Sequence, residues 1–168
     1  MKTQATQKTN SERLRRNEEK WSPALMDAGW TVLPSIILEK QHALGLDAVD
    51  VNILLQLARY WWFSDRPPFP SKATIAECMK VDPSTVRKHI ARMERDGIIR
   101  REYRFNAKKG GQEANAYHFT GLIKAATPFA KEAVQTRELR KSEDASRRRR
   151  KKPVLVINNT GNAGASNG

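Results

Sequence analysis

The chain has 168 residues and a net charge of +13, with 31 Lys and Arg against 18 Asp and Glu. This length allows one ordinary domain with tails, and 39% hydrophobic residues supply a modest core. No run approaches the roughly 18 to 20 apolar residues that span a bilayer, and the start MKTQATQKTN lacks the apolar stretch of a signal peptide. We therefore expect an intracellular protein that does not insert into a membrane. Its charge favours a polyanionic partner, either nucleic acid or an anionic membrane surface.

The positive charge is unevenly distributed. Residues 30–123 carry 14 Lys and Arg against 10 Asp and Glu, whereas residues 124–168 carry 11 against 4. More than half of the surplus therefore belongs to the C-terminal part. Cys78 is the only cysteine, which excludes an intramolecular disulfide, and its neighbours Ile75 and Met79 predict that it is a buried small hydrophobe.

The N-terminal part predicts an arm and two short helices. Residues 1–20 are polar and mixed in charge, so we expect a flexible or weakly helical arm. Residues 21–29 predict a helix begun by Ser22 and Pro23, with Leu25 and Met26 facing inward. The following segments predict a brief strand over 30–33 and a helix over 35–44 closed by Gly45; we expect Trp21 and Trp30 to pack nearby.

A longer core helix is predicted to begin after Asp47, which can cap it. Its inward stripe consists of Val49, Ile53, Leu54, Leu57, Ala58 and Trp61. The prolines of SDRPPFP, residues 64–70, cannot continue a helix. Trp61, Trp62 and Phe63 admit a ligand-binding interpretation, but aromatic residues at helical spacing usually fill a small core, and we adopt that interpretation.

Residues 71–105 predict two tightly joined helices and a strand. Ser71 can cap the first helix, in which Ile75, Ala76 and Met79 face inward. After Val81, Asp82 and Pro83 supply the cap and first residue of the second helix. That helix, residues 83–96, has an apolar face and a polar, cationic face, formed respectively by Val86, Ile90 and Met93 and by Ser84, Lys88, Ala91, Arg92 and Arg95.

A hairpin is predicted to follow Gly97, whose left-handed conformation ends the second helix. The first strand, residues 98–105, alternates so that Ile99, Tyr103 and Phe105 share one face. Gly110 and Gly111 favour a turn with a cationic tip at Lys108 and Lys109. The second strand, residues 115–120, directs Tyr117 and Phe119 inward.

The C-terminal part predicts a helix and a disordered basic tail. Residues 124–146 are good helix formers, although we expect Pro128 to break the helix. A solvated helix and a helix packed in a dimer both remain open. Residues 147–168 begin with six basic residues and otherwise have a disordered composition.

Catalytic chemistry is not predicted. His42, His89 and His118 are scattered, and neither a metal-ligand spacing nor a GxxxxGK phosphate loop is present. His89 lies at the edge of a packed helix face, where a hydrogen-bonded structural role is the preferred interpretation. We expect a protein that is not an enzyme and has no cofactor and no metal site.

The segment PSKATIAECMKVDPSTVRKHIARMERDGIIRR resembles winged helix-turn-helix regulators of bacteria, phages and plasmids, including relatives of the N-terminal domains of replication initiators. The resemblance extends over residues 47–120. It implies a mainly α fold with a small β-hairpin. The implied organisation is an arm at 1–20, a winged helix-turn-helix domain with an N-terminal extension at 21–123, a helix at 124–146 and a basic disordered tail at 147–168.

The resemblance also implies how such a protein docks on DNA. Helix 83–96 would lie in the major groove, and the wing, residues 106–113, would lie along the backbone or reach the minor groove. Residues suited to base edges and phosphates are Ser84, Thr85, Arg87 and Lys88, with Ser71 and Lys72 suited to a phosphate. Register and affinity would come from Arg92, Arg95, Arg100, Arg104, Lys108 and Lys109. The charge run itself predicts nonspecific nucleic-acid contact by Arg147, Arg148, Arg149, Arg150, Lys151 and Lys152, with a solubilising tail and a nuclear-localisation signal as the alternatives.

The implied function is sequence-specific binding of double-stranded DNA by a transcriptional regulator. We expect a cytoplasmic, nucleoid-associated protein that binds a palindromic or repeated site as a homodimer. A first alternative is a plasmid or phage replication initiator or partition adaptor that binds origin repeats, with a protein partner for the tail. A second alternative is a protein-interaction winged helix whose tail binds RNA or an anionic surface.

Overall fold

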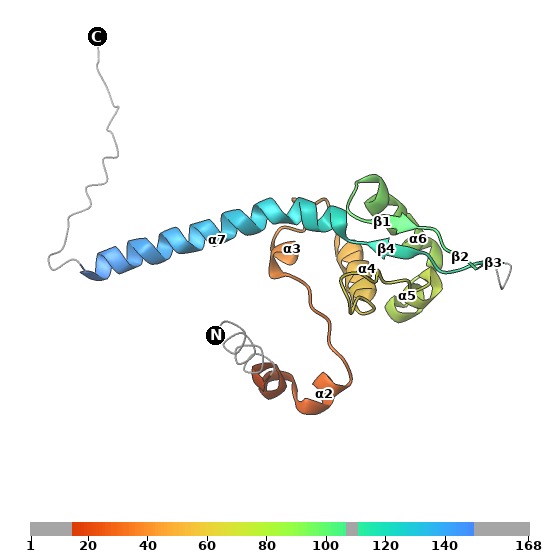
Figure 1. Ribbon diagram of the computed structural model, residues 1–168, viewed down its shortest axis with the longest axis horizontal. Helices are drawn as coiled ribbons and strands as arrows, with labels where there is room; N and C mark the ends of the chain where they lie inside the picture. Colours follow the sequence, from red (N-terminus) through yellow and green to blue (C-terminus); the bar gives the residue numbers. More distant parts are fainter. Residues whose placement is uncertain (1–14, 107–110, 150–168) are drawn as a thin grey trace, which may run out of the picture. The chain divides into compact units, whose positions relative to one another are not determined.

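The computed structural model describes residues 15–106 and 111–149 (Figure 1). Of these described residues, those up to Ala130 form one compact unit and those from Lys131 onward form a second. The helices are α2 (Pro23–Asp27), α3 (Ser35–Glu39), α4 (Ala48–Ala58), α5 (Lys72–Met79), α6 (Pro83–Arg95) and α7 (Thr120–Arg149). The strands are β1 (Arg100–Glu102), β2 (Phe105–Asn106), β3 (Gly111–Gln112) and β4 (Ala116–His118). Within the described ranges, no helix combines the length and apolar character needed to cross a membrane.

Helix α4 is the central core helix, as predicted. Asp47 caps it by accepting hydrogen bonds from the backbone N–H groups of Val49 and Asp50, each at 2.9 Å. The Asp50 carboxylate accepts in return from the Asp47 N–H at 2.9 Å, which completes a capping box. Ile53, Leu54 and Leu57 are fully buried, and the helix packs against both α5 and α6.

The predicted helix-turn-helix is confirmed by α5 and α6. Ser71 caps α5 by accepting from the Thr74 N–H at 3.0 Å, and Asp82 caps α6 by accepting from the Ser84 N–H at 2.7 Å. Lys80 ends α5 in a left-handed conformation, with φ of 54°. The inner face of α6 is fully buried and consists of Val86, Ile90 and Met93. Truncating Ile90 to alanine would cost about 2–5 kcal/mol of stability.

A wing follows Gly97, whose φ of +72° ends α6 as predicted. Strands β1 and β4 pair antiparallel, with Arg101 opposite Tyr117, and β2 and β3 pair antiparallel, with Phe105 opposite Gln112. Tyr117 and Phe119 are buried, as the alternation predicted. The expected uninterrupted strand over 98–105 is wrong, however. Ile99 is buried, but Tyr103 and Phe105 are exposed because β2 and β3 lie beyond the β1–β4 pair that packs on the core (Figure 1).

Helix α7 differs from the prediction at both ends and at Pro128. It begins at Thr120, runs through Pro128 without a break and continues to Arg149, so Arg147, Arg148 and Arg149 are helical rather than disordered. Proline removes one N–H donor and crowds the preceding turn, but the helix on both sides is long enough to hold the backbone. The Thr127 hydroxyl also donates to the Ile123 carbonyl at 2.6 Å in that turn.

Gly121 allows the start of α7 to lie against the end of α6. A Cβ at this position would stand 1.8 Å from the Gly97 carbonyl oxygen, and the adjacent Leu122 N–H donates to the Ile98 carbonyl at 2.7 Å. Leu122 and Ala126 then enter the core. A glycine is therefore required here by close approach of two backbones.

The N-terminal predictions were only partly correct. Residues 15–21 are helical, and Gly29 follows α2 at positive φ, but Leu25 is exposed and α2 has no buried residue. Residues 30–33 form no strand, and α3 ends at Glu39 rather than residue 44, followed by turns up to Gly45. Trp21 and Trp30 are exposed. A five-residue helix presents too little apolar surface to bury two indole rings.

The prediction that the aromatic residues after α4 fill the core is wrong for most of them. Trp61 stacks on Phe119, with ring centroids 4.9 Å apart, but Trp62 and Phe63 are exposed. The reason is that α4 ends at Ala58, so the following residues no longer have the helical spacing on which the prediction relied.

Cys78 is exposed, contrary to prediction. It lies about 110° around α5 from the centre of the inward stripe formed by Ile75, Ala76 and Met79, since each residue advances the helix by about 100°. The Arg59 guanidinium instead lies 3.7 Å from its sulfur.

Candidate nucleic-acid interface

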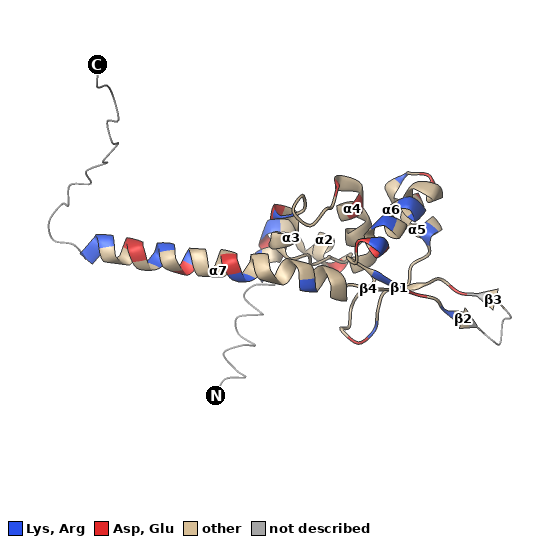
Figure 2. Cartoon of the chain, turned by 90° about the horizontal axis from the view of Figure 1, so that it is seen from above, with Lys and Arg blue, Asp and Glu red and all other residues tan. Residues whose placement is uncertain are grey.

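The outer face of α6 carries the residues that the sequence assigned to base and phosphate contact. Ser84, Arg87 and Lys88 are exposed, and Thr85 is half-buried. Blue Lys and Arg positions recur along this helix (Figure 2). The Asp82 carboxylate beside its N-terminus accepts from the Ser84 hydroxyl and N–H, and these two bonds lower the pKa of Asp82. The beginning of α6 is therefore fixed, and its polar face is open to solvent.

Basic side chains from α5, α6 and β1 lie close enough to one another for their charges to interact. Burial, followed by the charges of Arg101 and Arg87, lowers the pKa of Lys72. Neighbouring cations disfavour the protonated form of a lysine, and a bound anion would stabilise that form. Ser71 and Lys72 were both predicted to contact a phosphate. The Ser71 hydroxyl already accepts a hydrogen bond as the cap of α5, so Lys72 is the better candidate for that contact.

Arg101 belongs to this region, although the sequence did not single it out. Its guanidinium lies 2.6 Å from the Glu94 carboxylate and 5.1 Å from the centre of the Tyr103 ring, so it links β1 to α6. Its Nε is buried without a hydrogen-bond partner within the described part of the chain. The alternation of the predicted strand places Arg101 on the face of Ile99, but no local signal identifies Glu94 as its partner.

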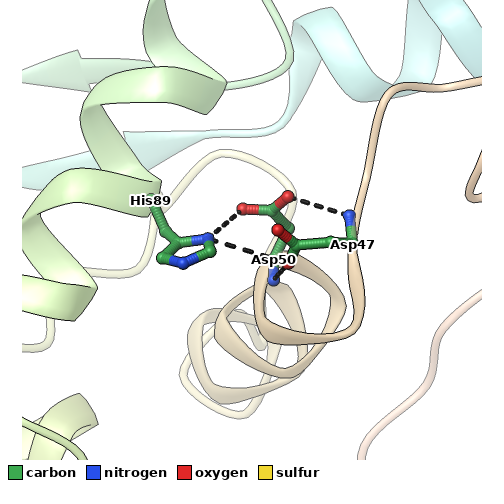
Figure 3. Close-up of side chains that lie close together, drawn as sticks. All are labelled: Asp47, Asp50 and His89. Atoms are coloured by element: carbon green, nitrogen blue, oxygen red, sulfur yellow. Dashed lines mark hydrogen bonds and ion pairs between the residues drawn. The ribbon is translucent and has the colours of Figure 1, made fainter.

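Arg92 is directed toward α4 rather than toward open solvent. Its Nη2 lies 2.5 Å from Asp47 Oδ2 and also contacts Asp50 Oδ2. His89 Nδ1 lies 2.8 Å from Asp50 Oδ1, and Asp50 is fully buried (Figure 3). We refer to Asp47, Asp50, His89 and Arg92 as the carboxylate cluster. It joins α6 to the N-terminus of α4, and it gives His89 the hydrogen-bonded structural role that was expected.

Within the carboxylate cluster, Asp47 and Arg92 stabilise each other's charged form. Burial acts to raise the pKa of Asp47, but the Asp50 N–H, the Arg92 guanidinium and the His89 ring outweigh it, and the net pKa is lowered. The Asp47 contact is the largest cause that raises the pKa of Arg92. Asp47 is therefore in its charged form at neutral pH.

The same carboxylates and His89 offer three ligand atoms within 4.8 Å of one another, a spacing compatible with a metal ion. Arg92 already supplies positive charge to both carboxylates, so a metal ion would have to displace its guanidinium. We therefore interpret the cluster as the support of α6. An open hollow of about 500 Å³ lies beside it and is lined by Lys88, His89, Ala91, Arg92 and Arg95.

The remaining predicted contact residues differ in their surroundings. Arg95 and Arg100 are exposed, at 3.9 Å from Asp96 and Glu102 respectively. Arg104 lies 3.3 Å from Glu113 and 4.5 Å from the centre of the Phe69 ring. Lys108 and Lys109 lie outside the described residues.

The predicted tail contacts are only partly described. Arg147 lies 3.4 Å from Asp144 and 3.8 Å from Glu143, and Arg148 and Arg149 are exposed on α7. Arg150, Lys151 and Lys152 lie outside the described residues.

Helices α4, α5 and α6, followed by the wing of β1 to β4 and by α7, define a winged helix-turn-helix domain. In agreement, residues 44–99 match the family model described as a helix-turn-helix domain. This class of domain points to DNA binding, and the exposed basic face of α6 is the face on which such binding would depend. No protein of curated function matches the sequence.

Solved structures with similar folds have low identities. The N-terminal domain of DnaD protein from Geobacillus kaustophilus HTA426 is 20% identical, with a TM-score of 0.49, covering 71% of this chain and 96% of its own. A possible transcriptional regulator from Methanosarcina mazei Go1 is 19% identical, with a TM-score of 0.38, covering 69% and 88%. YusO protein from Bacillus subtilis is 17% identical, with a TM-score of 0.37, covering 82% and 94%. At these values the similarities add nothing to the functional argument.

Proposed function

We propose that this protein is a sequence-specific, double-stranded DNA-binding regulator of transcription that places α6 in the major groove. The observation that carries the proposal is the division of α6 into two faces. Val86, Ile90 and Met93 are fully buried, while Arg87 and Lys88 are exposed. A helix held this firmly on one side can present the other side to base edges in a fixed orientation.

Phosphate contacts would surround this helix. Lys72 at the start of α5 and Arg100 on β1 are the candidate phosphate contacts. Arg92 has its charge compensated by the carboxylate cluster, so in this proposal it orients α6 and contributes little to phosphate binding. Contacts of Lys108 and Lys109 with the backbone or the minor groove are part of the proposal as well.

We propose a homodimer on a palindromic or repeated site, because one α6 contacts only a few base pairs and two-fold symmetric dimers read two half-sites. The N-terminal extension and α7 are the candidate interfaces. On α7, Val134 and Leu139 are large apolar side chains exposed to solvent, which supports this assignment. No catalytic step is part of the proposed function.

Selection of bound duplexes from random DNA, followed by fluorescence anisotropy, tests the proposal. We expect Arg87→Ala and Lys88→Ala each to weaken binding to the selected site and to relax the preference at one position, by about 1–3 kcal/mol. Lys20→Ala, a change of an exposed basic residue outside the winged domain and both candidate interfaces, is the matched control and should leave the preference unchanged. Unchanged affinity and preference in both α6 variants would contradict the docking.

Genome-wide occupancy then separates regulation of transcription from a role at an origin. Binding at dispersed promoters is the expected result. Occupancy confined to iterated repeats at one replication origin would instead assign the same domain to replication initiation or partition.

A further inference from the structure

A second exposed surface lies in the loop between α4 and α5. Tyr60, Trp62, Phe63 and Phe69 are 42%, 70%, 59% and 56% exposed, and we call these four residues the aromatic patch. Four large aromatic side chains exposed within ten residues of sequence are costly to leave in water. Such a patch usually marks a binding surface. Neither the core nor the proposed duplex-binding face uses it.

The aromatic patch forms a hollow together with neighbouring residues. The hollow measures about 360 Å³ and is lined by Tyr60, Trp62, Phe63, Arg66, Pro67, Phe69 and Pro70. Its walls are therefore rings and prolines, with Arg66 as the charged member. The prolines fix the loop backbone, so the rings are held in place without a ligand.

Arginines accompany three of the four rings. Arg59 lies 5.7 Å from the centre of the Tyr60 ring, Arg66 lies 5.1 Å from that of Phe63, and Arg104 lies 4.5 Å from that of Phe69. These rings remain partly exposed despite the guanidinium groups. The surface thus offers open aromatic area and positive charge at the same points.

The nearby acids do not reverse this charge. Glu113 lies 3.3 Å from Arg104 and is itself engaged there. Asp65 lines a different hollow, together with Trp61 and Phe119. The ligand best matched to the patch is therefore planar, apolar on its faces and anionic, which describes the stacked bases and phosphates of a single strand. A protein partner would supply aliphatic anchors and would gain little from an arginine at three of the rings.

We propose that the aromatic patch binds single-stranded nucleic acid by stacking bases on Trp62 and Phe63, with Arg59 and Arg66 contacting phosphates. Bases in a duplex hide their faces, so the patch is selective for unpaired strands. This site is separate from α6 and does not depend on the proposed duplex docking.

The test uses the full chain and fluorescein-labelled oligothymidylate and oligouridylate of about 16 nucleotides, together with a duplex of the same length. We expect Trp62→Ala and Phe63→Ala each to weaken single-strand binding by about 5- to 150-fold and to leave duplex binding unchanged. Trp21→Ala, another exposed tryptophan outside the patch, is the matched control. The thymidylate and uridylate arms distinguish DNA from RNA as the strand bound.

Two further measurements distinguish binding by the aromatic patch from binding by the basic tail and by the α6 face. A chain with Arg147, Arg148 and Arg149 changed to Gln should still lose single-strand affinity when Trp62 is removed. Lys88→Ala should weaken duplex binding only, so failure of this proposal and failure of the duplex docking give different results. Stacking should also quench tryptophan fluorescence in the wild type, and Trp62→Ala should lose this quenching.

The proposal is overturned if Trp62→Ala and Phe63→Ala bind both oligonucleotides as tightly as Trp21→Ala does. It is equally overturned if the two patch variants change self-association in analytical ultracentrifugation while single-strand affinity stays constant. That second result would assign the patch to a protein interface.

Discussion

Asp50 is the residue on which the orientation of α6 depends most. It is fully buried, and its carboxylate accepts from the Asp47 N–H, the His89 ring and the Arg92 guanidinium. Two of these partners come from α6, about 40 positions along the chain. Removing any one partner of a buried carboxylate leaves a polar group unsatisfied in the interior. Such a carboxylate therefore favours the one arrangement of α4 and α6 in which all of its partners are present.

We expect Asp50→Ala to lower the free energy of unfolding by about 3 kcal/mol, since it removes the capping-box acceptor and leaves His89 and Arg92 without their buried partner. Urea denaturation at neutral pH measures this change. Asp65→Ala, a change of an exposed aspartate, should stay within about 0.5 kcal/mol of the wild type. Equal stability of the two variants would show that the cluster contributes nothing to the fold.

At the scale of the element, arginines of α6 and β1 have different surroundings despite similar sequence contexts. Arg92 contacts two carboxylates, Arg101 contacts Glu94, and Arg100 is exposed with an acid only at 3.9 Å. Only an arginine whose charge is not already paired releases a counterion from DNA when it binds a phosphate. We therefore propose that Arg92 and Arg101 support the fold, whereas Arg100 contacts DNA.

Arg100→Ala should weaken binding to all duplex sequences similarly and reduce the slope of log affinity against log salt by about one unit. Arg92→Ala should instead lower the thermal midpoint and leave that slope nearly unchanged. Anisotropy titrations over a range of salt concentrations, paired with thermal denaturation, separate the two effects. The assignment of Arg92 to support and Arg100 to phosphate contact would be contradicted if Arg92→Ala reduced the magnitude of the salt slope more than Arg100→Ala does.

We propose that different parts of the chain supply sequence specificity and nonspecific affinity. The winged domain has a modest charge surplus but directed side chains, whereas residues 124–168 hold more than half of the surplus. A run of arginines and lysines attracts phosphates without reading base edges.

We expect removal of residues 147–168 to reduce affinity for every duplex and to flatten its salt dependence, while the ratio between selected and random sites is kept. Competition binding with a selected duplex and with random DNA measures that ratio. If truncation abolished binding while Lys88→Ala had no effect, nucleic-acid contact would belong to the tail alone, and the interaction-protein alternative would be favoured.

Local features were predictable because their causes lie within a few residues. Asp47, Ser71 and Asp82 cap their helices as expected, and Gly97 ends α6. A capping side chain needs only its own helix end, and an apolar period of three and four residues defines the buried face of α6 without knowledge of its partner. The same reasoning failed for Trp62 and Phe63, where the helix ended earlier than the pattern assumed.

Short-range caps, apolar periods and turn residues are enough to specify the helix-turn-helix, the hairpin and the cationic face of α6. The pairing of Arg92 and His89 with Asp50, the pairing of Arg101 with Glu94 and the exposure of the aromatic patch became known from the packed fold. Those outcomes depend on which distant elements meet. No local period encodes the partner of a charged side chain, so charge alone could not separate the arginines that support α6 from those exposed to a ligand.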